Sequence, residues 1–168
     1  MRRVQARGVL PTFKRAMEGV VAQFNNRKTE KGHAAVVLHL SPLKHLYRCM
    51  EKMCLKVSET RFSANGVCDI VRCIISCDNC TFMAEVLTAL MACGTIRVLR
   101  VKDRANHVTS MQWMDIMVNL TLKGEASAHV CEVQIVHHKM LVARTELGGH
   151  ATYAQLRGAA EMLDVLGV

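Results

Sequence analysis

The sequence is poor in aromatic residues, proline and glycine. Only 4% of its 168 residues are aromatic, and it holds two prolines and ten glycines. The scarcity of aromatic rings argues against a nucleic-acid module that stacks a row of bases. No apolar stretch approaches the roughly 18 uninterrupted residues that indicate a membrane span. The low charged fraction, 21%, argues together with the few prolines and glycines against long disordered regions.

Common nucleotide-binding and hydrolase motifs are also missing. The chain contains no GxGxxG, no GxxxxGK followed by serine or threonine, no GxSxG and no HExxH. The sequence therefore gives no support to a Rossmann domain, a P-loop NTPase, an α/β-hydrolase or a zincin. A length of 168 residues fits one domain that buries a core without disulfides or a structural metal.

Cysteine, in contrast, is abundant. The eight cysteines lie inside apolar segments, as small hydrophobic residues do, and no hydrophobic region of a signal peptide is present. We interpret them as reduced thiols of an intracellular, cytoplasmic protein. Cys77 and Cys80 form a lone CxxC pair without other ligands at zinc-finger spacing. We interpret this pair as the end of a strand and the start of a helix.

Positive charge is concentrated near the N-terminus. The net charge is +8, and residues 1–32 hold eight basic and two acidic residues, a net of +6. Such a segment favours a polyanionic partner, such as RNA or a large assembly that contains it. Apolar side chains at helical spacing over residues 13–25 leave two interpretations. The segment is a helix that packs on the domain, which we favour, or it targets the protein to mitochondria or another organelle.

Apolar periodicity and turn signals predict four helices and five strands. The expected helices cover residues 13–25, 42–57, 81–92 and 139–166, and the expected strands cover residues 34–40, 67–77, 95–102, 116–122 and 129–137. Ser41 and Pro42 are expected to open the second helix, and Gly148-Gly149 to kink the last one. The last two strands are expected to form an antiparallel hairpin. This order predicts an α/β (α+β) fold, a mixed sheet of about five strands flanked by helices.

Two carboxylates stand inside apolar strands. Asp69 lies in VCDIVRCII and Glu132 in VCEVQIV, where an unpaired carboxylate would be costly to bury. Gln134 shares a strand face with Glu132. Two carboxylates on neighbouring strands are a common way to hold a divalent cation for phosphate chemistry. The alternative is structural: Asp69 pairs with Arg72 or Arg104, and Glu132 pairs with a lysine or histidine.

Other candidate residues are basic or aromatic. Arg100, Lys102 and Arg104 alternate along an extended segment, so they form either a phosphate cradle or a solvated strand edge. The single tryptophan, Trp113, either stacks on a base or anchors the edge of the core. Three histidines are candidate bases or ligands, or surface and capping groups: His137, His138 and His150.

Five segments in order resemble the synthetase domain of the RelA/SpoT family. They are a serine-bearing helix start (41–50), DIVRCII (69–75), Lys-Asp-Arg (102–104), CEVQI (131–135) and the stretch ELGGHATY (146–153). The Glu-x-Gln strand followed by that last stretch is the most specific part. The resemblance implies a nucleotidyltransferase-like domain over residues 33–168, preceded by a basic arm over residues 1–32. It also implies pyrophosphate transfer from ATP to GDP or GTP.

The resemblance assigns roles to individual residues. It makes Asp69 and Glu132 the catalytic pair that binds Mg²⁺. It makes Trp113 the residue that stacks on the acceptor base. The remaining residues that it implies in substrate binding are Arg72, Lys102, Arg104, Gln134 and His150.

The sequence departs from the family pattern at two places. The family's Gly-Tyr-(Arg/Gln)-(Ser/Asp) loop reads Gln112-Trp113-Met114-Asp115 here, and Leu38-His39-Leu40 replaces an Arg and a Lys that hold ATP. Loss of two phosphate-binding cations weakens ATP binding. The alternative function is therefore a non-catalytic structural or binding subunit of a large assembly, which keeps the fold and docks through residues 1–32.

Overall fold

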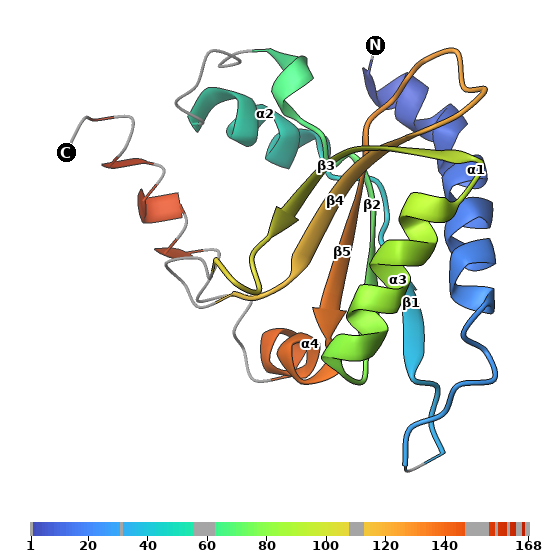
Figure 1. Cartoon of the computed structure of the whole chain (residues 1–168). Coiled ribbons are helices and arrows are strands. Elements are labelled where there is room, and N and C mark those ends of the chain that lie inside the picture. The colour runs from blue at the N-terminus through green and yellow to red at the C-terminus, as the bar shows by residue number, and fades with distance from the viewer. Residues whose placement is uncertain are drawn as a thin grey trace.

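The computed structural model describes residues 2–30, 32–55, 63–107 and 113–146, together with residues 155, 156, 158–160, 162, 163 and 166 (Figure 1). Its elements follow the order that the sequence predicted. In chain order they are α1 (Arg2–Ala22), β1 (Val36–Leu40), α2 (Leu46–Leu55), a 3-10 turn η1 (Ala64–Gly66), β2 (Val71–Cys77), α3 (Cys80–Ala92), β3 (Ile96–Asp103), β4 (Ile116–Leu122), β5 (Cys131–His137) and α4 (His138–Thr145).

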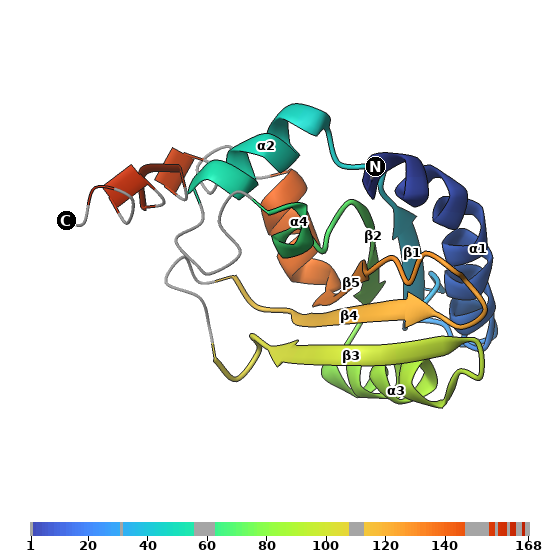
Figure 2. The ribbon, with the colours of Figure 1, turned by 90° about the horizontal axis from the view of Figure 1, so that it is seen from above.

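The strands form one mixed five-stranded sheet in the order β1-β2-β5-β4-β3. The central pair β2 and β5 is parallel, and the other three pairs are antiparallel, including the expected β4–β5 hairpin. Helices α1 and α3 cover one face, while α2 and α4 lie on the other side (Figure 2). The predicted α/β (α+β) fold class is confirmed. We call the face turned away from α1 and α3 the open face.

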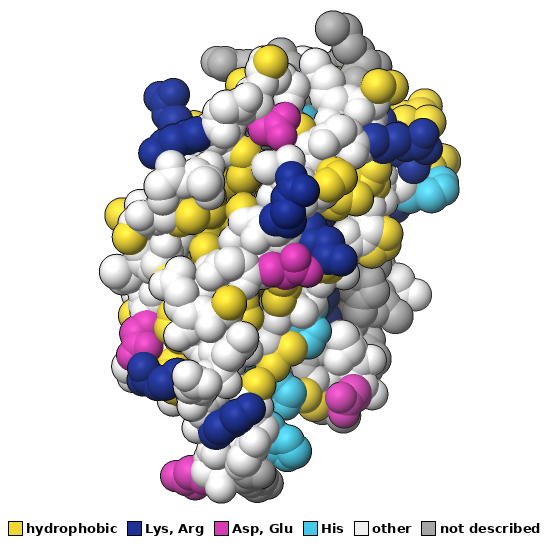
Figure 3. All heavy atoms as spheres, turned by 90° about the vertical axis from the view of Figure 1, so that its right-hand side faces the viewer, with side chains coloured by type: hydrophobic (Ala, Val, Ile, Leu, Met, Phe, Trp, Pro, Cys, Tyr) yellow, Lys and Arg dark blue, Asp and Glu magenta, His cyan; other side chains and the backbone are white. Residues whose placement is uncertain are grey.

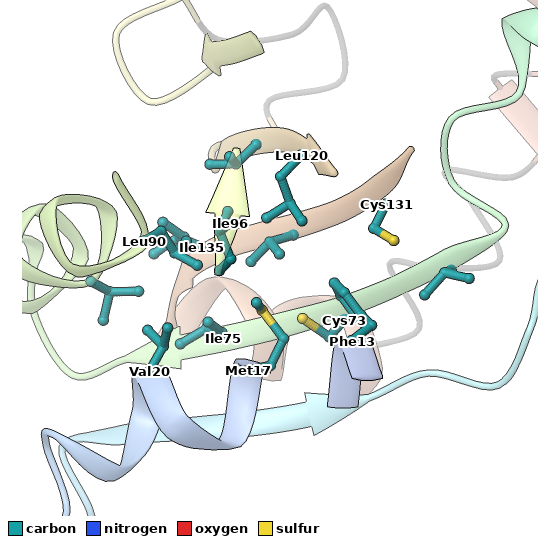
Figure 4. Close-up of a cluster of buried hydrophobic side chains, with 14 of the residues drawn as sticks. Phe13, Met17, Val20, Cys73, Ile75, Leu90, Ile96, Leu120, Cys131 and Ile135 are labelled. Carbon is teal, nitrogen blue, oxygen red and sulfur yellow. The ribbon is translucent and has the colours of Figure 1, made fainter. Parts of the chain in front are cut away.

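The core lies between the sheet and the two helices α1 and α3. Apolar side chains at alternate strand positions, such as Cys73, Ile75 and Ile135, meet Met17 of α1 and Leu90 of α3 (Figure 4). All five are buried. Because two helices cover this face, the polar side chains of the sheet that could contact a ligand are those on the open face.

Helix α1 is longer than the sequence predicted and packs on the sheet. Its buried stripe is Ala6, Val9, Phe13, Met17 and Val20, so the apolar spacing begins well before residue 13. The helix therefore belongs to the same core as the sheet. The division of the chain into an arm over residues 1–32 and a domain over residues 33–168 stays a prediction. On this side, Lys and Arg are spread over the surface with Asp and Glu between them (Figure 3).

Helix α2 starts later than expected. Ser41-Pro42 predicted a start near residue 42, but the helix begins at Leu46. The backbone N–H of Lys44 donates a hydrogen bond to the carbonyl of Ile70 at 3.0 Å, which holds this segment extended beside the approach to β2. The tertiary contact overrides the local capping signal.

Helix α3 begins as the sequence predicted. Asn79 caps it, with its side-chain oxygen accepting from the N–H of Phe82 at 2.9 Å. Cys77 ends β2, and burial raises the pKa of its thiol to about 12, while Cys80 opens α3. The lone CxxC pair is thus the strand end and helix start that we expected.

The last expected helix is described only in part. Helix α4 ends at Thr145, and Gly148-Gly149 and most of the expected continuation to residue 166 lie outside the described residues. Within the described part of the chain, no helix combines the length and apolar character that crossing a bilayer requires.

Candidate functional site

A row of polar side chains crosses the open face of the sheet. Arg100 of β3 is paired in register with Asn119 of β4, and Asn119 with Glu132 of β5. Glu132 is paired in turn with Arg72 of β2. Directly paired residues project to the same face of a sheet, so these four residues form one line, which we call the polar row.

Glu132 is the buried carboxyl group of the polar row. Its Oε1 accepts a hydrogen bond from Nε2 of Gln134 at 3.0 Å. Burial raises the pKa of Glu132, and the negative charge of Asp69 raises it further, while Lys52 and Arg104 act in the opposite direction. The net effect is a carboxyl group that holds its proton more tightly than an exposed glutamate does.

Asp69 lies just before β2 and is neutralised by two lysines. Nζ of Lys44 donates to its Oδ2 at 2.7 Å, and Nζ of Lys52 lies 3.1 Å from Oδ1. Burial alone would raise the pKa of Asp69, but the charges of Lys52 and Lys44 outweigh it and lower the pKa. Arg72 instead donates to the backbone carbonyl of Asp69 at 3.1 Å. The expected partnership of this carboxylate with Arg72 or Arg104 is therefore wrong.

A second network joins Trp113 to the polar row. Arg104 binds the fully buried Asp115 with two hydrogen bonds, Nε to Oδ1 at 2.6 Å and Nη2 to Oδ2 at 2.7 Å. Nε1 of Trp113 donates to the same Oδ2 at 2.8 Å. The guanidinium of Arg144 lies 5.0 Å from the centre of the Trp113 ring and donates to Oε1 of Gln134 at 3.4 Å. Arg104 is thus paired with Asp115, and the Trp113 ring already contacts the guanidinium of Arg144.

The structure brings most of the predicted site residues to one face. Lys102 is paired in register with Met117 on the same face as Arg100. His150 lies outside the described residues. His137 caps α4, with Nδ1 accepting from the N–H of Lys139 at 3.1 Å, and His138 begins that helix.

Five residues of this region were missed from the sequence: Lys44, Lys52, Asp115, Asn119 and Arg144. One of them could have been identified from the sequence. Asn119 interrupts the apolar strand IMVNLTL just as Glu132 interrupts its own. Lys44 and Lys52 could not, because their contacts with Asp69 depend on how the segment around α2 packs against the residues before β2.

The metal-ligand geometry rests on two carboxyl groups. Among the residues that the structure describes, no group of three or more His, Cys, Asp or Glu side chains is arranged to hold a metal ion. Oδ1 of Asp69 is buried and lies 3.1 Å from Nζ of Lys52. Both carboxylate oxygens of Asp69 therefore face a lysine ammonium group.

Comparison with known proteins gives matches in structure alone. No protein-family model matches the sequence, and no curated protein is similar to it. A GTP pyrophosphokinase family protein from Streptococcus pneumoniae has 15% identity and a TM-score of 0.70, covering 91% of this chain and 75% of that protein. Small alarmone synthetase 1 from Bacillus subtilis, bound to its product pppGpp, has 16% identity and a TM-score of 0.67, covering 94% and 85%.

Small alarmone synthetase 2 from Bacillus subtilis is similar to the same degree. It has 15% identity and a TM-score of 0.65, with 92% of this chain and 80% of that one covered. The chain therefore has the fold of these RelA/SpoT-like alarmone synthetases, at 15–16% sequence identity.

Proposed function

Because the chain has the fold of the small alarmone synthetases, we propose that it transfers pyrophosphate from ATP to the 3′-hydroxyl of GDP or GTP. The observation that carries this proposal is the buried Glu132 beside Asp69 at the start of the parallel strands β2 and β5. A buried carboxyl group that feels the charge of a second one is costly to ionise unless cations or a reaction compensate for it.

The charges around the two carboxyl groups suit a polyphosphate. The cations on or beside the open face are Lys44, Lys52, Arg72, Arg100, Lys102, Arg104 and Arg144. The acidic groups among them are Asp69, Asp115 and Glu132. The surplus of cations favours a ligand with several negative charges, and pyrophosphoryl transfer needs mainly positioning and charge neutralisation.

Mg²⁺ is the cofactor that fits the donor set. Carboxylate oxygens are its preferred protein ligands, and it is usually held by one or two of them together with substrate phosphates. Asp69 and Glu132 would hold the ion through their carboxylate oxygens. When bound, Mg²⁺ would neutralise charge on the donor phosphates. Lys52 is the residue with which the ion would compete for Asp69.

The remaining residues position the two nucleotides. Arg72 lies at the β2 end of the polar row, and Lys102 lies on β3 beside the other end. Both are proposed to bind phosphate oxygens. Trp113 is proposed to stack on the acceptor base. Its indole is already oriented by the hydrogen bond to Asp115, so the ring does not have to be ordered on binding.

A transfer assay tests this function. The purified protein is incubated with Mg²⁺, labelled ATP and GDP or GTP, beside Glu132→Gln and the matched control Glu18→Gln on the exposed side of α1. The wild type and Glu18→Gln are expected to form labelled guanosine tetra- or pentaphosphate, and Glu132→Gln is expected to form none. Equal product from wild type and Glu132→Gln would contradict the proposed role of Glu132.

One observation favours the alternative of a non-catalytic nucleotide-binding or structural subunit. Both oxygens of Asp69 already face lysine ammonium groups, so its charge is balanced without a metal. In that case guanine nucleotide binds, no labelled product forms, and binding is insensitive to Mg²⁺. Association with RNA or a large assembly remains a prediction of this alternative.

A further inference from the structure

A cavity lies beside α1, on the side of the sheet away from the polar row. Its volume is about 480 Å³, and its walls come from α1, from the connection between α3 and β3, and from the end of β4. Figure 2 shows α1 next to the end of β4 and the start of β3. Cavities of about 300–1,000 Å³ hold small molecules, so this one has room for a ligand.

The inner wall of this cavity is apolar. Ala16 and Val20 of α1 line it together with Leu122 of β4, and Val20 and Leu122 are buried. Gly19, which also lines it, leaves space, because a Cβ there would meet no atom within 4 Å. The cavity therefore offers a surface on which the apolar body of a ligand can be buried.

Two cations line the same cavity without an acidic group beside them. Arg15 comes from α1 and Lys123 from the turn after β4, and the lining includes no Asp or Glu among the residues that the structure describes. Neither cation has an ion-pair partner in that part of the chain. Lys14, next to Arg15, is instead paired with Glu18 at 3.7 Å. Two like charges that share a cavity without a counter-charge favour an anion.

The walls also restrict the charge that the anion can carry. A carboxylate suits a guanidinium and an ammonium group, which hold it with charge-assisted hydrogen bonds. A polyphosphate would leave charge without a partner against apolar side chains, which is costly. The lining thus fits a singly charged ligand whose remaining part is apolar.

We propose that this cavity binds a small organic anion, a carboxylic acid with an apolar body. Its carboxylate contacts Arg15 and Lys123, and its body lies against Val20 and Leu122. The site is separate from the open face, so it does not depend on the nucleotide chemistry proposed there.

Binding of octanoate to the full chain tests the proposal. Octanamide is the neutral ligand of the same shape, and inorganic phosphate is an anion without an apolar body. In NMR titrations, octanoate is expected to shift the amide signals of Gly19 and Lys123 and to bind at least about tenfold more tightly than either control. No octanoate binding, equal affinity for octanoate and either control, or shifts that leave both amides unmoved would overturn the proposal.

Charge variants show whether the two cations hold the carboxylate. Arg15→Gln and Lys123→Gln are each expected to weaken octanoate binding about threefold to tenfold. Lys14→Gln removes the same charge from the neighbouring position and is expected to leave the affinity unchanged. Equal effects of the three variants would mean that octanoate responds to net charge and would overturn the assigned contacts.

A glycine variant closes the cavity. Gly19→Leu places a side chain in the empty space and is expected to abolish octanoate binding. Gly8→Leu is the matched control on the same helix, because a Cβ there also meets no atom within 4 Å and Gly8 does not line the cavity. It is expected to bind octanoate as the wild type does. Unchanged binding in Gly19→Leu would overturn the site, and the two charge variants decide if Gly19→Leu does not fold.

Discussion

Glu132 and Asp69 lie close together, yet their environments move their pKa values in opposite directions. Burial and the neighbouring carboxylate raise the pKa of Glu132, whereas two lysines hold that of Asp69 low despite its burial. The result is one carboxyl group inclined to keep a proton and one that stays ionised, the division of roles that acid–base chemistry at a phosphate site needs.

Replacing Glu132 by glutamine is expected to stabilise the protein at neutral pH. A raised pKa means that the native state binds the proton more tightly than the unfolded chain, so stability falls as pH rises through the native pKa. Glu132→Gln removes this loss and is expected to raise the melting temperature at pH 7. The gain should vanish well below the ordinary glutamate pKa value of 4.5, where both states carry the proton. A melting temperature that falls at pH 7 would contradict this assignment.

Replacing Asp69 by asparagine is expected to destabilise the protein at neutral pH. The variant leaves Lys44 and Lys52 without their counter-charge and should cost about 3 kcal/mol in the free energy of unfolding at pH 7. Because the native pKa is lowered, the wild-type advantage is present above the ordinary value of 3.8 and disappears as pH falls below it. Urea unfolding at pH 7 and pH 3 measures both effects.

An exposed aspartate gives the control for that variant. Asp78→Asn is expected to change the free energy of unfolding by no more than about 0.5 kcal/mol at either pH. If Asp69→Asn is equally mild, the two lysine contacts do not stabilise the native state.

Sequence reasoning found the buried carboxylates but not their partners. Asp69 and Glu132 were visible as charges within apolar strands, a purely local anomaly. Lys44 and Lys52 could not be assigned, because the contact with Asp69 joins segments 17 to 25 residues apart and depends on where α2 starts. The pairing of Arg104 with Asp115 could not be predicted, because Asp115 lies in a loop whose path the sequence does not determine.

At the scale of elements, strands were more predictable than helix ends. β4 has the predicted bounds, and α3 begins within one residue of its predicted start and ends at its predicted residue, Ala92. The start of α2 was wrong because a backbone hydrogen bond from Lys44 to Ile70 competes with the capping signal of Ser41-Pro42. α1 begins well before the predicted residue 13, because Ala6 and Val9 continue its buried stripe toward the N-terminus.

Helix α1 is expected to be essential for folding. Met17 is fully buried against the sheet, so Met17→Ala should cost about 2–5 kcal/mol in the free energy of unfolding. Met91 on α3 is 64% exposed, and Met91→Ala is the matched control, with a change below about 0.5 kcal/mol. Guanidinium unfolding of the two variants compares them directly. Equal stability would mean that α1 does not belong to the folded core in solution.

At the scale of the whole molecule, most of helix α1 and the candidate site lie on different sides of the sheet, while Arg3 at the start of α1 lies near Cys49. Most of the net charge of +8 belongs to residues 1–32, and α1 covers the face opposite the polar row. The charge of the site comes instead from a local cluster in a part of the chain that is nearly neutral overall. Net charge therefore says little about the ligand of the open face.

This arrangement predicts that nucleotide binding is sensitive to charge on one side only. Lys102→Gln on the open face is expected to weaken GTP binding by about threefold to tenfold, as loss of a charge-assisted phosphate contact does. Lys14→Gln on α1 removes the same charge from the other side and should leave the affinity unchanged. Fluorescence titration of the single tryptophan measures both, and equal effects would mean that binding follows net charge.

The fate of the ATP label tests the central claim most directly. The protein is incubated with Mg²⁺, GDP and ATP labelled at the β-phosphate, and the products are separated. Pyrophosphoryl transfer moves the β-label to the guanosine product and leaves unlabelled AMP, and Glu132→Gln is expected to abolish this. A guanosine product without the β-label, or no guanosine product from the wild type while GDP still binds, would contradict the claim.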